Sequence, residues 1–234
     1  MRRTLTTQAV SHRISLGLRL WAGISFLTAF LALFIASGAA RAASLEIVAL
    51  GDSLTAGYQL PPGAGFPEQL GRALAAKGYD VSVMNAGVSG DTSAGGLARL
   101  DWAVGPDTDA LILELGSNDA LRGIEPDVTR ANLQTIIERM KQRGIKVLIA
   151  GMLAPPNMGD DYARDFNAIF PELAAEHDTL LYPFFLDGVA ANPALNLPDG
   201  MHPTEEGVAV MVERILPTVE KLIAEADGST AAIN

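Results

Sequence analysis

Residues 45–54 read Leu-Glu-Ile-Val-Ala-Leu-Gly-Asp-Ser-Leu, and this stretch decides the fold. Its first six residues are almost all apolar, as expected for a strand that is covered on both faces of a parallel sheet. Gly51 and Asp52 end the apolar run, and an Asp or Ser after a strand is most often the N-cap of a helix. A strand that turns directly into a helix is the first half of a βαβ unit, so this stretch predicts an α/β protein.

The rest of the chain repeats this alternation of short apolar runs and helical periodicities. We therefore predict a single three-layer α/β/α domain built on a five-stranded parallel sheet. Three segments carry apolar residues at i, i+3, i+4 and i+7, which predicts helices, and Pro217 should bend or end the last of them. The expected strands are Leu45–Leu50, Asp80–Met84, Ala110–Leu115, Lys146–Ala150 and Leu180–Pro183, and the helical sets begin at Leu133, Phe166 and Val208.

The first 42 residues differ in composition from the remainder. They carry five Arg and no acidic residue, include an uncharged run from Leu20 to Ala40, and end in Ala40-Arg41-Ala42. This pattern predicts a secretory signal peptide at residues 1–42 and a periplasmic or secreted protein. An uncleaved membrane anchor is the alternative, because the uncharged run is long enough to span a bilayer. We expect the domain to occupy residues 43–227 and residues 228–234 to form a disordered tail.

Charge and cysteine content exclude several classes of partner. The chain has 17 Lys plus Arg against 27 Asp plus Glu, and loss of the five Arg in residues 1–42 leaves a net charge of −15. Such a surface repels phosphate backbones, so we expect neither a nucleic-acid partner nor stable membrane insertion after cleavage. The absence of cysteine removes any thiol nucleophile and any thiolate metal site. We expect no cofactor and no metal.

A serine, a histidine and an aspartate stand out as a possible reactive set. A serine hydroxyl is a weak nucleophile until a base takes its proton, and a carboxylate helps by fixing the tautomer of the base. His202 is the candidate base for Ser53, since His12 falls in the predicted signal peptide and His177 in a polar stretch where we expect a solvated side chain. Asp199 can hold Nδ1–H of His202. The plainer interpretation makes Ser53 a helix N-cap and His202 a helix-entry residue.

Gly87 and Asn118 follow two further predicted strands, and the carboxyl ends of parallel strands meet at one edge of the sheet, where ligands bind. The Asn118 side chain could donate an N–H to a developing oxyanion, worth about 3 kcal/mol per donor, or it could simply form a turn. Gly87 could allow a backbone N–H to approach the substrate, or it could be present only for a positive φ. Ser53 N–H would be the third donor.

These segments resemble the GDSL, or SGNH, hydrolase family, which is named for its Ser, Gly, Asn and His. The four blocks occur in the family's order and span about residues 45–225, and their surroundings look like the periplasmic branch of thioesterases, lysophospholipases and arylesterases. Ser117 stands where that branch often has Gly, which we expect to affect the conformation of the loop. The blocks are Gly51-Asp52-Ser53-Leu54, Gly87, Asn118 and Asp199-Gly200-Met201-His202.

The resemblance implies a flavodoxin-like SGNH hydrolase fold and assigns a role to each block. Ser53 would be the nucleophile, His202 the base and Asp199 the residue that orients it. Ser53 N–H, Gly87 N–H and the Asn118 side chain would form the oxyanion hole. The implied activity is hydrolysis of aryl esters, acyl-CoA thioesters or lysophospholipids through an acyl-enzyme intermediate.

Residues 152–162 form a Pro-containing and Met-containing loop that could cover an acyl chain, and we take Leu153 and Met158 as candidate substrate contacts. The nearest alternative is a carbohydrate O-acetyl esterase on the same fold, although apolar Leu153, Met158 and Phe184 favour a longer or aromatic acyl group. A metal-dependent phosphoesterase would need more than the two histidines that follow residue 42. Glu114, in the most apolar strand, has no evident partner.

Overall fold

The computed structural model describes residues 44–228, so the predicted signal peptide and residues 229–234 lie outside the described part of the chain. One sheet of five parallel strands has the order β2-β1-β3-β4-β5, as predicted. This is the flavodoxin-like order of a doubly wound sheet. The strands are β1 (Leu45–Gly51), β2 (Val81–Gly87), β3 (Ala110–Leu113), β4 (Lys146–Ala150) and β5 (Leu180–Tyr182).

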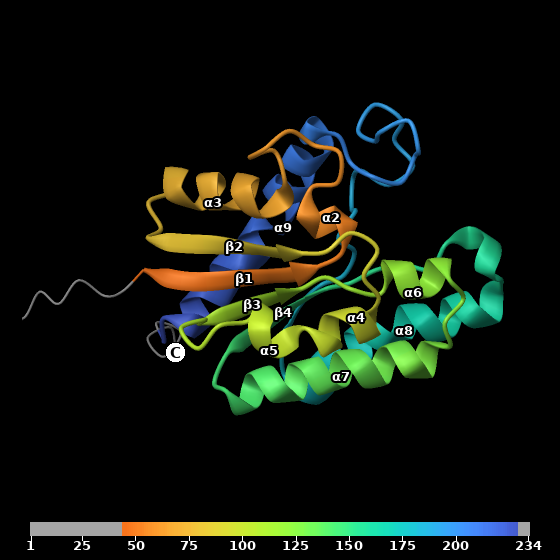
Figure 1. Ribbon diagram of the computed structural model, residues 1–234, viewed down its shortest axis with the longest axis horizontal. Coiled ribbons are helices and arrows are strands. Elements are labelled where there is room, and N and C mark those ends of the chain that lie inside the picture. Colours follow the sequence, from red (N-terminus) through yellow and green to blue (C-terminus); the bar gives the residue numbers. More distant parts are fainter. Residues whose placement is uncertain (1–43, 229–234) are drawn as a thin grey trace, which may run out of the picture. The chain divides into compact units, whose positions relative to one another are not determined.

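Helices cover both faces of the sheet, which gives the predicted three layers. In Figure 1, α3 and α9 lie on one side of the strands, and α4, α5, α7 and α8 lie on the other. The helices are α2 (Ser53–Ala56), α3 (Phe66–Ala76), α4 (Ser93–Ala98), α5 (Leu100–Ala103), α6 (Ser117–Leu121), α7 (Pro126–Gln142), α8 (Asp160–His177) and α9 (Glu205–Ala226), with a short 3₁₀ helix η1 (Pro156–Met158).

The apolar periodicities predict the packing of α7, α8 and α9 correctly. All four residues of each predicted stripe are buried against the sheet or against a neighbouring helix. No helix within residues 44–228 combines the length and the apolar character that a membrane crossing requires.

Of the two effects expected of Pro217, a bend or an end of the last helix, the second does not occur, because α9 continues to Ala226. A proline removes one backbone hydrogen bond from a helix interior. Val219 and Ile223, two and six residues beyond Pro217, are buried in the core, and their burial favours continuation of the helix.

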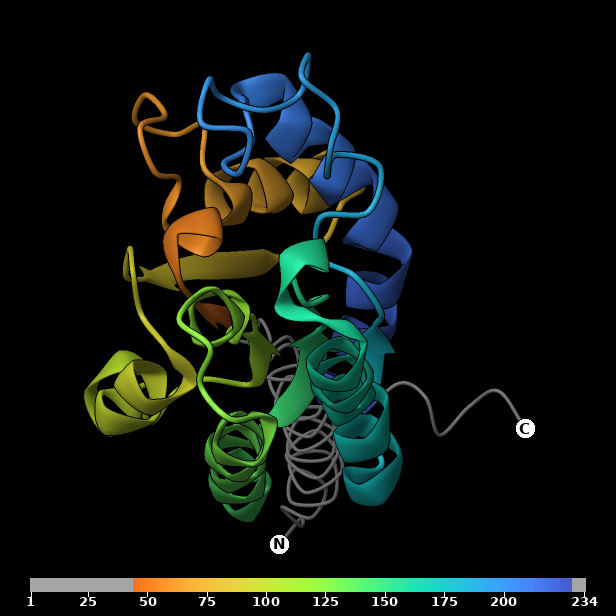
Figure 2. The same cartoon turned by 90° about the vertical axis from the view of Figure 1, so that its right-hand side faces the viewer.

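The carboxyl ends of the strands gather the segments that carry the predicted site. Figure 2 looks onto this edge, where α2, α6 and the loops after β4 and β5 lie around one region. The connection that leaves β1 runs to one face of the sheet through α3, and the connection that leaves β3 runs to the other face through α7. The adjacent ends of β1 and β3 are thus the switch point of the topology, where doubly wound sheets bind ligands.

Candidate active site

The turn between β1 and α2 presents the Ser53 side chain. Asp52, rather than Ser53, is the N-cap of α2, since Asp52 Oδ1 accepts a hydrogen bond from Leu54 N at 2.9 Å. The N-cap interpretation of Ser53 is therefore wrong. Because Asp52 serves as the cap, the Ser53 hydroxyl is free to face another group.

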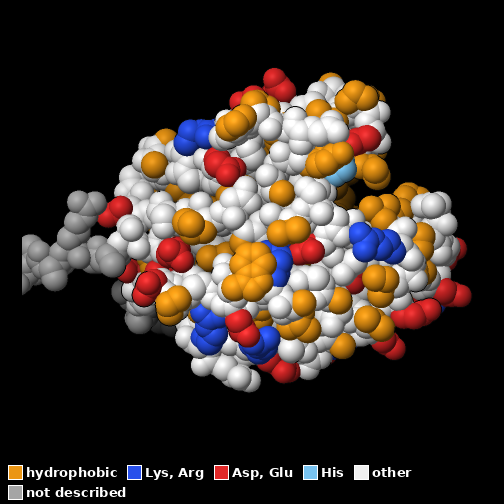
Figure 3. Space-filling view, viewed as in Figure 1, with side chains coloured by type: hydrophobic (Ala, Val, Ile, Leu, Met, Phe, Trp, Pro, Cys, Tyr) orange, Lys and Arg blue, Asp and Glu red, His pale blue; other side chains and the backbone are white. Residues whose placement is uncertain are grey.

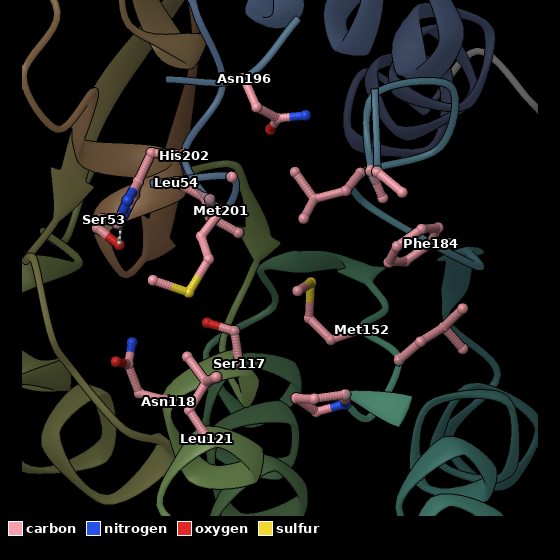
Figure 4. A pocket seen from close by; sticks show the side chains of 16 residues that line it. Ser53, Leu54, Ser117, Asn118, Leu121, Met152, Phe184, Asn196, Met201 and His202 are labelled. Atoms are coloured by element: carbon pink, nitrogen blue, oxygen red, sulfur yellow. Dashed lines mark hydrogen bonds between the residues drawn. The ribbon is translucent and has the colours of Figure 1, made fainter. Parts of the chain in front are cut away.

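Ser53, His202 and Asp199 form a continuous hydrogen-bonded series. Ser53 Oγ lies 2.9 Å from His202 Nε2, and His202 Nδ1 lies 2.7 Å from Asp199 Oδ2. The close-up in Figure 4 shows Ser53 and His202 side by side at one wall of a cavity. The ring of Tyr58 packs against the imidazole with 4.4 Å between ring centroids. The structure thus brings together the three side chains that the sequence proposes as nucleophile, base and orienting residue.

The Asp199 carboxylate is held by the backbone of its own loop. Its Oδ1 accepts hydrogen bonds from Met201 N at 2.9 Å and from His202 N at 3.0 Å. The amides of His202 and Met201, together with the His202 imidazole, lower the pKa of Asp199 to about 2. The carboxylate is therefore charged whenever the imidazole beside it is neutral, which favours the tautomer with hydrogen on Nδ1.

His177, the other histidine outside the predicted signal peptide, ends α8 and takes no part in this hydrogen-bonded series. It is half-buried, and its Nε2 atom is buried without a hydrogen-bond partner among residues 44–228. The expectation of a solvated side chain is therefore wrong. The polar neighbours in sequence did not reveal that the imidazole folds back onto the protein.

Asn118 stands in the first turn of α6, beside the serine turn. Its Nδ2 donates to Asp52 Oδ2 at 2.9 Å, which fixes the orientation of the amide. An amide nitrogen has two hydrogens, so one remains for a ligand in the cavity. Ser117 Oγ also donates to Asp52 Oδ2. The serine that departs from the family pattern therefore reaches the site itself, which its position in the sequence did not indicate.

The prediction that Gly87 supplies an oxyanion donor needs correction. Val88 N donates to Gly51 O at 3.0 Å, and alternate amides of a strand point in opposite directions, so Gly87 N–H points away from β1. That amide instead donates to Asn85 Oδ1 at 3.0 Å. Position 87 requires a glycine for a different reason, because a Cβ there would lie 2.3 Å from Ala56 N of helix α2.

A second glycine of the same loop is better placed for this role. Gly90 has φ +84° in the turn that Asp91 N closes by donating to Val88 O at 3.0 Å, the pattern of a type II turn. Gly90 O accepts a hydrogen bond from Arg122 Nη2 at 2.7 Å, which joins this loop to the helix that carries Asn118. Within residues 44–228, no hydrogen bond engages Gly90 N–H.

A cavity of about 300 Å³ opens beside Ser53 and His202. Its walls are mainly apolar, and Figure 3 shows hydrophobic side chains on both sides of a hollow in this part of the surface. In Figure 4, Met152 and Phe184 lie across the cavity from the serine, and Asn196 lies above. The side chains that do not belong to the hydrogen-bonded series include Leu54, Leu121, Met152, Leu153, Pro155, Phe184, Leu186, Asn196 and Met201.

One of the two predicted substrate contacts lines this cavity. Leu153 belongs to its wall, but Met158 does not. Met158 ends η1, and its Cε packs beside Gly123, 3.6 Å from where a Cβ of that glycine would lie. The predicted loop is also shorter than expected, since α8 already begins at Asp160. Leu121 and Met201 also line the cavity, and their places in the sequence did not indicate this because α6 and the loop before His202 meet only in the folded chain.

A serine, an imidazole and a carboxylate in series at the switch point of a doubly wound sheet define the class of serine hydrolases. Residues 49–210 match the model of the GDSL-like lipase/acylhydrolase family. The chain therefore belongs to the GDSL-like lipase/acylhydrolase family.

Relatives of known name support this membership. An arylesterase of Vibrio mimicus is 40% identical over 82% of this chain and 96% of its own length. The thioesterase 1/protease 1/lysophospholipase L1 of Escherichia coli is 36% identical over 78% of this chain and 88% of its own. The crystal structure of AlinE4, an SGNH-hydrolase family esterase, matches with a TM-score of 0.66 and 44% identity over 78% of this chain and 98% of its own.

Proposed function

We propose that this carboxylic ester hydrolase works through Ser53, with His202 as base and Asp199 as the residue that orients the base. Ser53 Oγ attacks the carbonyl carbon while its proton passes to His202 Nε2. The tetrahedral intermediate then expels the alcohol or thiol, which takes the proton from the imidazole, and leaves an acyl-serine. Water repeats the sequence and releases the carboxylic acid.

The observation that carries this proposal is the pair of contacts at the imidazole. Its two nitrogens lie 2.9 Å from the Ser53 hydroxyl and 2.7 Å from the Asp199 carboxylate. Both distances fall in the range that proton transfer from a nucleophile to an oriented base requires.

The oxyanion would be stabilised by three N–H groups. We assign them to Ser53 N, the Asn118 side chain and Gly90 N, the last in place of Gly87. Neither Ser53 N nor Gly90 N has another acceptor within residues 44–228. A preorganised donor of this kind contributes about 3 kcal/mol to the stability of the transition state.

The cavity favours an aryl group or an acyl chain over an acetyl group. A site for acetylated sugars would be small and polar, whereas Met152, Leu153 and Phe184 give this one apolar walls. The names of the relatives, an arylesterase and a thioesterase/lysophospholipase, agree with this substrate class. We propose aryl esters, acyl thioesters and lysophospholipids as substrates, with carbohydrate acetyl esters as the alternative.

A screen of p-nitrophenyl esters from acetate to palmitate, with acyl-CoA, a lysophospholipid and an acetylated xylan, tests both proposals. We expect the highest kcat/KM on chains longer than acetate, and a loss on the order of 10⁶ in kcat for Ser53→Ala. A Ser53→Ala variant that keeps the wild-type rate would refute the assignment of the nucleophile.

Within residues 44–228, no group of three or more His, Cys, Asp or Glu side chains is arranged so that it could hold a metal ion. Loss of activity in EDTA, restored by zinc or manganese, would favour the metal-dependent alternative.

We also propose that the protein is exported and that the mature chain begins near Ala43. Support comes from the basic start, the uncharged run and Ala40-Arg41-Ala42. Mass spectrometry of the protein from an exporting host tests the cleavage site. Full-length chain confined to the membrane fraction would favour the anchor.

A further inference from the structure

Glu114 lies directly beneath the turn that carries Ser53. It follows β3, and its side chain is fully buried. Glu114 Oε2 accepts hydrogen bonds from Asp52 N at 3.1 Å and from Thr55 Oγ1 at 2.8 Å. A single carboxyl oxygen thus ties the residue before the serine to the residue two places after it.

The glycine of the Gly-Asp-Ser-Leu segment makes room for this contact. A Cβ on Gly51 would lie 2.4 Å from Glu114 Oε2 and 2.1 Å from Thr55 Oγ1, closer than real Cβ atoms come to other heavy atoms. A backbone hydrogen bond also joins the two segments, since Glu114 N donates to Leu50 O at 2.8 Å. Gly51, Thr55 and Glu114 therefore form one packed unit under the nucleophile.

Complete burial favours the uncharged form of the Glu114 carboxyl. Its Oε1 atom is buried and has no hydrogen-bond partner within residues 44–228. The charged groups that face this turn are Asp52 and the ion pair of Arg99 with Asp91. Arg99 donates hydrogen bonds to Asp91 Oδ2 and to Gly51 O rather than to Glu114. Burial, and then the neighbouring charge of Asp52, raise the pKa of Glu114 well above its ordinary value.

We propose that Glu114 is a positioning residue for the nucleophile, whose Oε2 holds the turn from Asp52 to Thr55 and so sets Ser53 Oγ opposite His202. Glu114 does not line the cavity and acts only through the turn. Glu114 also affects Asn118 indirectly. It accepts a hydrogen bond from Asp52 N, and the side chain of Asp52 accepts the hydrogen bond from Asn118 Nδ2. The inference rests on the proposed role of Ser53.

Two substitutions at this position separate positioning from simple packing. Glu114→Gln keeps a neutral side chain with an oxygen acceptor, and we expect its kcat to stay within about threefold of wild type. Glu114→Met keeps the length of the side chain and removes the acceptor. A displaced reacting atom costs on the order of 10² in rate, so we expect Glu114→Met to lower kcat by roughly 10- to 100-fold with KM within about threefold.

A matched pair of threonine variants controls for loss of stability. Thr55→Val removes one of the two bonds to Glu114, whereas Thr108→Val removes a comparable bond to Glu46 Oε1, 3.0 Å long, just before β3 at the opposite end of the sheet. Thr108→Val should lower the melting temperature and leave kcat unchanged, whereas Thr55→Val should lower kcat. Far-ultraviolet circular dichroism verifies that each variant is folded.

The results expected for the Gln and Met variants support the inference only together. A folded Glu114→Met variant with wild-type kcat would overturn it, as would a loss confined to KM. A Glu114→Gln variant as slow as Glu114→Met would also overturn it, because the ionisable proton would then be what matters. The proposed function fails on a different result, namely wild-type rate in Ser53→Ala.

Discussion

The Asp199 carboxylate keeps its charge under almost any working condition. Its ordinary pKa of 3.8 is lowered to about 2, mainly by two backbone amides, so the group is ionised at neutral pH. Any loss of activity between neutral pH and about pH 5 must then come from a group other than Asp199. We expect the profile of kcat/KM against pH to show no ionisation of Asp199 in that range.

Asp199→Asn tests the division of roles between carboxylate and imidazole. The amide of Asn would accept the hydrogen bonds from the loop less strongly, and it would no longer stabilise an imidazolium or fix the tautomer of His202. We expect kcat to fall by roughly 10³–10⁴, clearly less than in Ser53→Ala, with an altered pH profile. Residual rates at a series of pH values measure this. A loss as complete as that of Ser53→Ala would make Asp199 part of the chemistry rather than its support.

Asn118→Ala should slow the chemical step while leaving substrate binding nearly intact. The free N–H of the amide acts on charge that exists only in the transition state, so we expect kcat to fall by roughly 10²–10³ with little change in KM. Asn118 also donates to Asp52, and Ser117→Ala provides the control because it removes the other side-chain donor to the same oxygen. Ser117→Ala should cost less than tenfold in kcat. A raised KM with intact kcat would instead make Asn118 a ground-state contact.

The residue types of the site could be predicted from the sequence, but some of their directions could not. Ser53, Asp199 and His202 followed from chemistry and order along the chain. Gly87 was misassigned because spacing alone does not show toward which side of a strand an amide points. The hydrogen-bond partners of Glu114 could not be predicted because they lie 59 and 62 positions away in the sequence.

At the scale of elements, the turn from β1 into α2 tolerates no side chain at its first position. Gly51→Ala would place a Cβ 2.4 Å from Glu114 Oε2 and 2.1 Å from Thr55 Oγ1. Overpacking of this kind costs about 1–3 kcal/mol, and here it would also displace the serine, so we expect a lower urea midpoint together with a lower kcat. Gly105→Ala is the matched control, since no atom lies within 4 Å of its Cβ position. Equal behaviour of the two variants would contradict this account.

The strands could be predicted from their short apolar runs, and the helices α7, α8 and α9 from their regular apolar periodicities. The ends of these elements could be predicted less closely. β3 ends at Leu113 rather than Leu115, and this earlier end places Glu114 at the exit of the strand, under the serine turn. α9 passes through Pro217 because long-range burial outweighs a local preference, which no window of sequence reports.

At the scale of the whole domain, the sheet order brings distant parts of the chain to one edge. Ser53 and His202 are 149 positions apart, yet they meet because β1 lies inside the sheet and the chain returns over its carboxyl edge before α9. The same arrangement buries Asp52 and Glu114 beneath the site, and burial raises the pKa of Asp52 as well as that of Glu114. Two acids held in this way make the stability of the domain depend on pH.

The sign of that dependence can be worked out for Glu114. Its pKa in the folded protein lies well above the ordinary value of 4.5, so the folded state holds a proton that the unfolded chain has already released. Below about pH 4.5 both states hold the proton and the favourable contribution is fully present, but it is lost progressively as the pH rises toward the folded pKa. Glu114→Gln cannot titrate. The melting temperature of Glu114→Gln relative to wild type should therefore increase from pH 4 to pH 8, and calorimetry at intermediate pH values measures this. A difference that stays constant, or that shrinks as the pH rises, would show that Glu114 is ionised in the folded protein.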